Sequence, residues 1–187
     1  MPGRTAKEAI QNFAGFLNET LSCVTDTCLV AFQESDNKYK LFLKDPVPIS
    51  SRSGHRFYLS VVQTCTVEKL EGGFKVHTLY YSYIFSDSPA FAYHGVFSYH
   101  WHPDEFNVRH PHLHLRITPE LGYPEIERKI AKAHYPTSRV CIEDFILLLI
   151  KYYDIQPLLG GAQWSRILRK NRNAFAKGAT WFVTHNK

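Results

Sequence analysis

The sequence predicts an α+β protein with a central antiparallel sheet, an N-terminal helix and two to three C-terminal helices. Apolar residues recur at helical spacing near the start of the chain, and again after residue 117. Between them lie several segments rich in Val, Thr, Tyr and Phe, which are typical of strands. Because the strands are grouped instead of alternating with helices, we expect antiparallel pairing.

Length and composition favour one globular domain over residues 1–187. The chain is 44% hydrophobic and 21% charged, which excludes a disordered or fibrous protein. We expect a helical part at 1–24, the sheet at 25–117 and a helical, basic part at 118–187. No apolar run reaches the roughly 20 residues of a membrane span, and we expect no membrane partner. The four cysteines form no zinc pattern, and free thiols suit the cytoplasm.

The first helix is predicted from its cap and its apolar spacing. Thr5 and Glu8 fit a capping box. The residues expected to face the core follow at helical spacing: Ile10, Phe13, Leu17 and Leu21.

Six strands are expected next. The first four cover residues 28–33, 38–43, 56–67 and 74–85, with turns at 35–37 and 71–73, and the last two of these form a long hairpin. Residues 45–54 are expected to form a loop, because they are too rich in Pro and Ser for a central strand. Two further strands, 94–102 and 110–117, are joined by a polar segment.

Helices are expected after residue 117. One begins near Pro124, and a second begins near Thr137 or Ser138. The inward stripe of the second helix is Ile142, Phe145, Leu149 and Tyr152. Gly160 and Gly161 are expected to separate this helix from the last one. The residues of the last helix expected to face inward are Trp164, Ile167, Leu168 and Phe175.

Histidine is concentrated in the last two predicted strands. Six of the ten histidines lie within residues 94–114: His94, His100, His102, His110, His112 and His114. Side chains alternate along a strand, so the histidines share one face while the apolar residues, Tyr99 and Leu113 among them, take the other. A hairpin centred near Phe106 places His100 opposite His112, His102 opposite His110 and Ser98 opposite His114, with opposed Cβ atoms roughly 4.5–5.5 Å apart.

The preferred function from these residues is endoribonuclease-type cleavage of RNA, a hydrolase activity that requires no cofactor. Such cleavage needs a base, an acid and a cation near the phosphate, and imidazole serves as either acid or base near neutral pH. The candidate catalytic residues are His100, His102, His110, His112, His114, Arg109 and Arg116.

A transition-metal site is the alternative. Neutral imidazole is a common zinc ligand, and a catalytic zinc needs three protein ligands and an open position. The candidate ligands are His100, His102, His110, His112 and His114, with Asp104 completing or orienting the site. This alternative covers a zinc hydrolase and a protein that only binds metal.

Two families resemble parts of this chain. The run His110-Pro111-His112-Leu113-His114 resembles the His-x-His-x-His signature of the histidine-triad nucleotide hydrolases and transferases, which implies His112 as nucleophile. Residues 80–117 are similar to the TumE-like toxins of bacterial toxin–antitoxin systems. That resemblance implies RNA as the target and an antitoxin protein as a partner.

The C-terminal part suggests a third, non-enzymatic function. Residues 155–187 carry six Lys or Arg and no acidic residue, which favours a polyanionic partner such as RNA. The candidate nucleic-acid-binding residues are Arg166, Arg169, Lys170 and Arg172. Arg128 and His134 have the spacing of the helical HEPN ribonucleases, but the many strands disfavour that fold. We therefore interpret His134 as a residue near a helix end with no catalytic role.

Overall fold

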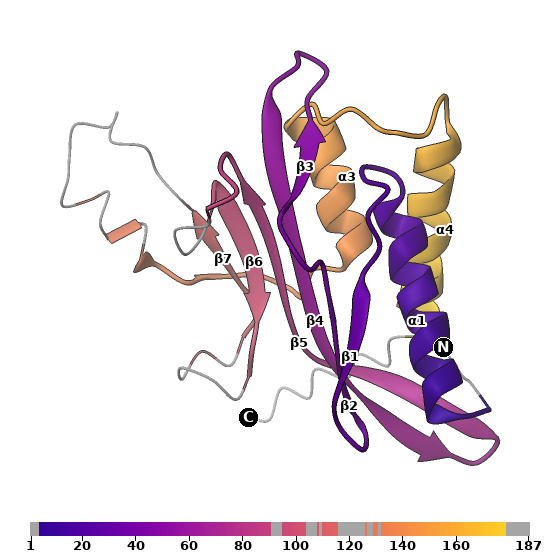
Figure 1. The fold of residues 1–187 in the computed structure, drawn as a ribbon. Coiled ribbons are helices and arrows are strands. Elements are labelled where there is room, and N and C mark those ends of the chain that lie inside the picture. The colour runs from indigo at the N-terminus through magenta and orange to yellow at the C-terminus, as the bar shows by residue number, and fades with distance from the viewer. Residues whose placement is uncertain are drawn as a thin grey trace.

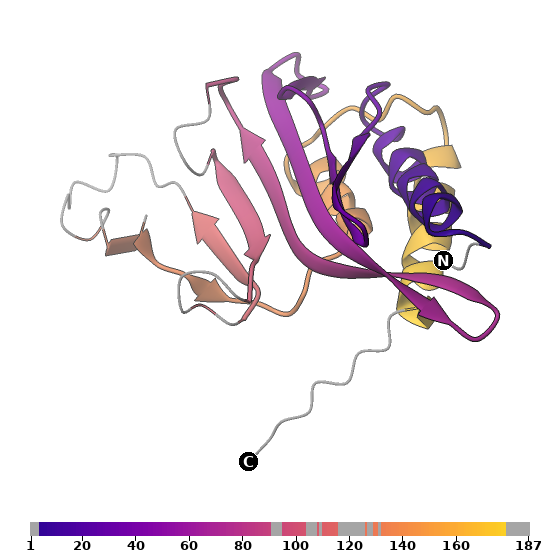
Figure 2. The same cartoon turned by 60° about the horizontal axis from the view of Figure 1, so that its bottom comes forward.

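The computed structural model describes residues 4–90, 95–103, 108, 110–115, 126, 129–130 and 132–178. An N-terminal helix, an antiparallel sheet of eight strands and two C-terminal helices confirm the α+β prediction. Figures 1 and 2 show the three helices on one side of the sheet, beside its longest strands. No helix in the described ranges is long and apolar enough to cross a membrane.

Three helices form the layer on that side: α1 (Ala6–Leu21), α3 (Ile142–Tyr152) and α4 (Gln163–Gly178). The expected cap of α1 is present, because the hydroxyl of Thr5 accepts a hydrogen bond from the backbone N–H of Glu8 at 3.1 Å. Of the predicted apolar stripe of α1, Ile10, Leu17 and Leu21 are buried and Phe13 is partly buried, and α1 packs against both α3 and α4. In α4 the four residues expected to face inward all pack on the core.

The sheet is built around one long hairpin. Its strands lie side by side in the order β1 (Val30–Ser35), β2 (Lys38–Phe42), β4 (Arg56–Leu70), β5 (Gly73–Ser86), β6 (Phe97–Trp101), β7 (His112–Leu115) and β8 (Tyr135–Pro136). β4 and β5 pair from Tyr58 opposite Ser86 to Leu70 opposite Gly73, which confirms the predicted hairpin. β6 and β7 follow at one end, where Figure 1 shows them farthest from α1 and α4.

One strand lies where the sequence predicted a loop. β3 (Val47–Ser50) pairs with β4 and with no other strand in the described chain. Val47 and Ile49 are buried, while Pro48 and Ser50 are exposed. The loop prediction was wrong because an edge strand needs ladder hydrogen bonds on one side only, and this position tolerates a proline.

The start of the third helix was also placed incorrectly. α3 begins at Ile142, not near Thr137 or Ser138, and Tyr135–Pro136 form β8, which was not expected. Tyr152 is 80% exposed, whereas Ile146 and Ile150 are buried. The inward stripe therefore follows the more apolar side of the helix. The helix expected near Pro124 falls mostly outside the described residues, although residues 126, 129–130 and 132 are helical.

The core lies between the helices and one face of β5 and β6. Phe145 of α3 is fully buried, and its ring packs against those of Tyr83, Phe97 and Tyr99 at centroid distances of 5.5, 5.8 and 6.2 Å. Gly95, with φ of 60°, leads into β6, and a Cβ there would collide with the carbonyl oxygen of Phe85. This close approach holds β6 against β5 and fixes which of its residues face the helices.

Candidate metal centre

The predicted pairing of the two histidine strands is confirmed. β6 and β7 are antiparallel, with His100 opposite His112 and Ser98 opposite His114. Among the described residues this ladder ends at His100 and His112, so the expected pair of His102 with His110 is not part of it. The register places three of the six histidines of the predicted strands, His100, His112 and His114, close together on the sheet.

The two faces of this strand pair differ as the alternation predicts. Tyr99 and Leu113, which lie opposite each other, pack on the hydrophobic core that the helices cover. Their neighbours His100 and His112 therefore point away from the helices, to the other face of the sheet. The imidazoles are separated from the core by the thickness of the sheet itself.

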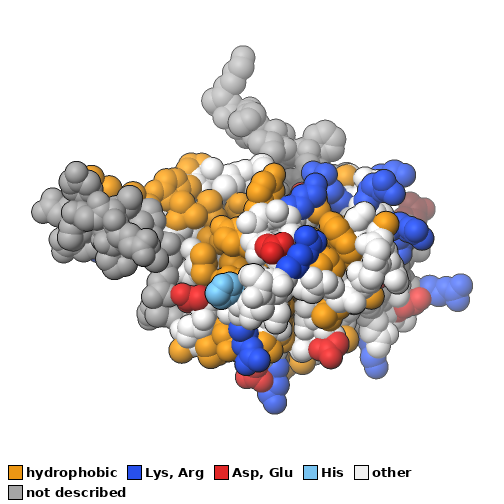
Figure 3. Space-filling model, turned by 90° about the horizontal axis from the view of Figure 1, so that it is seen from above, with side chains coloured by type: hydrophobic (Ala, Val, Ile, Leu, Met, Phe, Trp, Pro, Cys, Tyr) orange, Lys and Arg blue, Asp and Glu red, His pale blue; other side chains and the backbone are white. Residues whose placement is uncertain are grey.

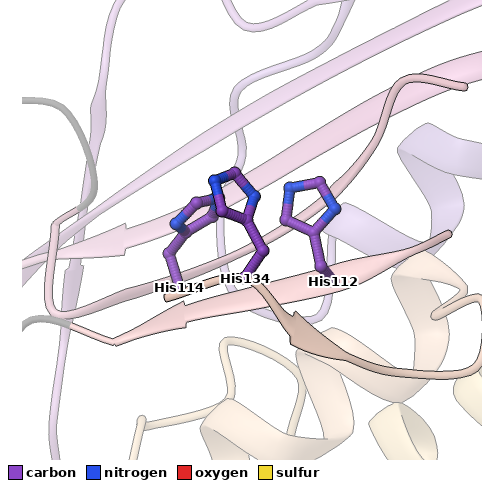
Figure 4. A group of neighbouring side chains, drawn as sticks. All are labelled: His112, His114 and His134. Atoms are coloured by element: carbon purple, nitrogen blue, oxygen red, sulfur yellow. The ribbon is translucent and has the colours of Figure 1, made fainter. Parts of the chain in front are cut away.

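A third strand brings one more histidine to this face. β8 pairs with β7, with Leu113 opposite Tyr135, and His134 directly precedes β8. The His134 ring lies 4.7 Å from the His112 ring and 4.4 Å from the His114 ring, measured between centroids. Figure 4 shows the three rings on the same side of the strands. One ring nitrogen from each residue lies within 4.8 Å of the other two.

A hydrogen bond to the backbone carbonyl of His110 holds the His112 ring in one tautomer. Nδ1 of His112 lies 3.0 Å from the carbonyl oxygen of His110, and a carbonyl can only accept a hydrogen bond. Nδ1 therefore carries the proton of the neutral ring, and Nε2 carries the lone pair. Nε2 is buried and has no hydrogen-bond partner among the described residues. A metal-binding histidine has this arrangement, in which one nitrogen donates to a backbone carbonyl and the other binds the metal.

Burial favours the neutral form of the rings. His112 is 0% exposed and His114 is 4% exposed, while His134 is exposed. Burial lowers the pKa of His112, although the hydrogen bond to the His110 carbonyl raises it, and the charges of His102, His134 and His110 lower it further. Burial also lowers the pKa of His134, as do His102 and His110. Near neutral pH these two rings are therefore uncharged, the form that binds a metal.

The remaining predicted histidines surround His112. His100 stacks on it with ring centroids 5.9 Å apart and an angle of 11° between the rings, and Nε2 of His100 lies 2.8 Å from the hydroxyl of the buried Ser98. The ring of His102 lies 4.9 Å from that of His112, and the ring of His110 lies 6.2 Å from it. The four other predicted catalytic histidines thus gather around the His112 ring.

Several predicted site residues lie outside the described residues. These are Arg109 and Arg116, expected to stabilise a phosphate, and Asp104, expected to complete a metal site. His94 also falls there. Their expected roles stay predictions.

The basic helix is not part of the histidine face. α4 packs on α1 and α3, on the helix-covered side of the sheet. All four basic residues are exposed, and two of them form ion pairs: Lys170 with Glu19 and Arg172 with Asp144, each at 2.8 Å. On the face seen in Figure 3, described Lys and Arg side chains are scattered among acidic ones. The structure therefore does not join the four basic residues and the histidines in one surface.

Sequence reasoning missed His134. It was interpreted as a residue without a catalytic role, yet the structure places it against His112 and His114. The available signal was the short sequence His134-Tyr135-Pro136, in which an extended segment follows a histidine after a helical stretch. The pairing of that segment with β7 depends on tertiary structure, which spacing along the chain does not reveal.

The arrangement provides three nitrogen donors and an approach for solvent. Zinc binds imidazole nitrogen at about 2.0–2.1 Å, so tetrahedral ligands lie about 3.3 Å apart. The three nitrogens lie within 4.8 Å of one another, so side-chain rotation and small backbone shifts would have to bring them to that spacing around a bound metal. Exposure of His134 leaves one side of the centre accessible, as a catalytic site requires.

Comparison with protein-family models, with curated proteins and with solved structures finds no match to this chain.

Proposed function

We propose that this protein binds zinc, or another divalent transition metal, through His112, His114 and His134, and that the metal centre is hydrolytic. The observation that carries the proposal is the convergence of three ring nitrogens within 4.8 Å, one of them a buried lone pair on His112. Imidazole suits zinc, copper, iron and nickel. Three histidines leave a fourth position for water, and a bound metal lowers the pKa of that water toward neutrality.

Metal content tests the binding part of the proposal. After zinc loading and exhaustive dialysis, we expect about one zinc per chain, as for a site with three protein ligands. His112→Ala and His114→Ala are expected to reduce the zinc content to background. His55→Ala is the matched control, because His55 is exposed and precedes β4, outside the cluster. Equal zinc retention by all four proteins would refute the proposed ligands.

Activity tests the hydrolytic part separately. The zinc-loaded protein is assayed against a chromogenic phosphodiester and against single-stranded RNA, with and without excess chelator. We expect turnover that stops in chelator and returns when zinc is restored. Stoichiometric zinc binding without turnover of either substrate would leave a metal-binding protein and refute the hydrolytic part.

Metal-free cleavage of RNA is the second candidate. The observation that favours it is that the rings of His102 and His112 lie 4.9 Å apart, with His100 stacked on His112, which places a base and an acid side by side. This candidate predicts RNA products with a cyclic phosphate in excess chelator, and loss of cleavage in both His102→Ala and His112→Ala. Under it, the resemblance to TumE-like toxins predicts an antitoxin protein that co-purifies and blocks cleavage.

We also propose that this protein is located in the cytoplasm. All four cysteines are free, and three of them, Cys23, Cys65 and Cys141, are buried. Burial raises the pKa of Cys23 to about 11, so this thiol stays protonated and unreactive. Free structural thiols support a reducing cytoplasm.

A further inference from the structure

The strand β1 forms one end of the sheet, at the opposite end from β7 and β8. It pairs with β2 on one side, and no strand in the described chain pairs with its other side. Its only extensive contact with another described element is with β2, because α1 lies over β4 and β5. The backbone N–H and C=O groups along the outer side of β1 are therefore available to a further strand.

The side chains of this edge are exposed and partly apolar. All six residues of β1 are exposed, and two of them are large and apolar: Val30 is 44% exposed and Phe32 is 57% exposed. The stretch from Val30 to Gln33 contains no charged residue and no proline, the two kinds of residue that protect the edges of sheets. The pairing with β2 becomes irregular only between Gln33 and Ser35, at the end of the strand. An edge of this kind pairs readily with another strand.

The pairing with β2 shows on which face each side chain of β1 lies. Ala31 lies opposite Leu41, which is fully buried in the core, so Ala31 is on the helix side of the sheet. Val30 and Phe32, its neighbours along the strand, are therefore on the face without helices. Val30 lies opposite Phe42 on that face. An apolar row from Phe42 to Val30 thus crosses the open face and ends at the outer side of β1.

Antiparallel pairing of β1 with a second copy of itself extends this row. Opposite residues in a sheet share a face, so the two-fold axis has to pass through a residue of the strand. With the axis at Ala31, Val30 of each copy lies opposite Phe32 of the other, and pairs of aromatic and β-branched side chains stabilise sheets. An axis at Phe32 would instead place Val30 opposite Glu34. With the axis at Ala31 every large apolar residue of the edge has an apolar partner, so the edge is complementary to itself.

We propose that two copies of this protein form a dimer by antiparallel pairing of their β1 strands about a two-fold axis at Ala31. Such pairing is symmetric and joins the two sheets into one. One short strand buries less area than a standard interface of about 1,200–2,000 Å², so the dimer is weak and reversible. Both histidine sites remain uncovered, because they lie at the opposite end of each sheet from β1. The dimer therefore does not depend on metal binding.

Sedimentation velocity measures the association. The whole protein is used in excess chelator and reducing agent, so that neither a metal bridge nor a disulfide at the exposed Cys28 joins two chains. We expect reversible dimer formation between about 10 and 500 µM, as for a small interface. A protein that stays monomeric over this range would overturn the proposal.

A charge in the apolar row tests whether β1 is the contact. Phe32→Lys is expected to raise the dissociation constant of the dimer by about tenfold or more, because the contact with Val30 is lost twice. Leu158→Lys is the matched control, since Leu158 is also 57% exposed and lies outside the strands. Wild-type dimerisation of a folded Phe32→Lys protein, or equal weakening by Leu158→Lys, would refute pairing through β1.

Disulfide trapping tests the register, and it remains informative even if Phe32→Lys loses its fold. In a Cys28→Ser background, Ala31→Cys places two thiols opposite each other at the axis, where Cβ atoms lie about 4.5–5.5 Å apart. Gln33→Cys is the control, because its two copies are displaced by about 13 Å along the strands. We expect oxidation with copper phenanthroline to cross-link Ala31→Cys and not Gln33→Cys. Equal or greater cross-linking of Gln33→Cys, or no cross-linking of Ala31→Cys, would refute the pairing at Ala31.

Discussion

The carbonyl oxygen of His110 lies 3.0 Å from Nδ1 of His112 and fixes which nitrogen of that ring carries the proton. His110 lies two residues before His112, so the segment that leads into β7 orients the ring. As a result Nε2, the nitrogen with the lone pair, remains as the buried donor beside His114 and His134.

This relationship predicts the tautomer of His112 in solution. In metal-free protein near pH 7.5, ¹⁵N NMR of the imidazoles should show His112 with a protonated Nδ1 and an unprotonated Nε2. The reason is the hydrogen bond to the His110 carbonyl, together with the burial that lowers the pKa of His112. Exposed His55 is the internal comparison and should exchange between tautomers. A His112 ring protonated at Nε2 would contradict the assignment.

The histidines and the hydrophobic core lie on opposite faces of the sheet, so a substitution in the core should change stability without changing zinc binding. Phe145→Leu should lower the free energy of unfolding by about 1–3 kcal/mol, because it removes ring contacts in a fully buried position. Zinc stoichiometry should not change, since Phe145 packs on the face of the sheet opposite the histidines. Urea unfolding and zinc analysis measure the two effects. Tyr152→Ala is the control, because Tyr152 is 80% exposed and its loss should change stability by no more than about 0.5 kcal/mol.

Burial of Glu143 predicts a pH dependence of stability. Burial raises the pKa of its carboxyl above the unfolded value, so between the two values the folded protein binds more protons than the unfolded one. The contribution of this carboxyl to the free energy of unfolding is therefore fully present below the unfolded pKa. It decreases as pH rises toward the folded pKa, by up to about 1.4 kcal/mol for each pH unit between the two pKa values.

Glu143→Gln isolates this effect. The variant cannot ionise, so its stability relative to wild type should increase as pH rises from 4.5 to 8. Urea unfolding of both proteins across that range measures the difference, and ionisable groups common to both largely cancel. A difference that is independent of pH would mean that Glu143 does not have a raised pKa.

Much of the fold follows from local patterns. The spacing of Ile10 and Leu17 predicts α1, and alternation in β6 and β7 predicts which side of each strand carries histidine. These predictions succeed because they depend on the geometry of a single element or of one hairpin. The alternation allows only registers that keep the apolar residues on one face, and a hairpin centred near Phe106 selects the one that pairs His100 with His112.

The remaining features depend on contacts between distant parts of the chain. β3 contains Pro48 and forms because β4 extends far enough to pair with it. His134 joins the histidines because β8 pairs with β7, although His134 lies 20 positions after His114 in the sequence. The small space lined by Phe16, Gln63, Tyr81 and Glu143 combines residues of three helices and two strands, and no local pattern identifies it.

X-ray absorption at the zinc edge tests the central claim most directly. For zinc-loaded protein we predict about three imidazole nitrogens at about 2.0–2.1 Å, with the remaining position filled by oxygen. The same measurement on His112→Ala should lose this environment, whereas His55→Ala should keep it. A zinc spectrum without imidazole scattering, or one that does not change in His112→Ala, would contradict a centre formed by His112, His114 and His134.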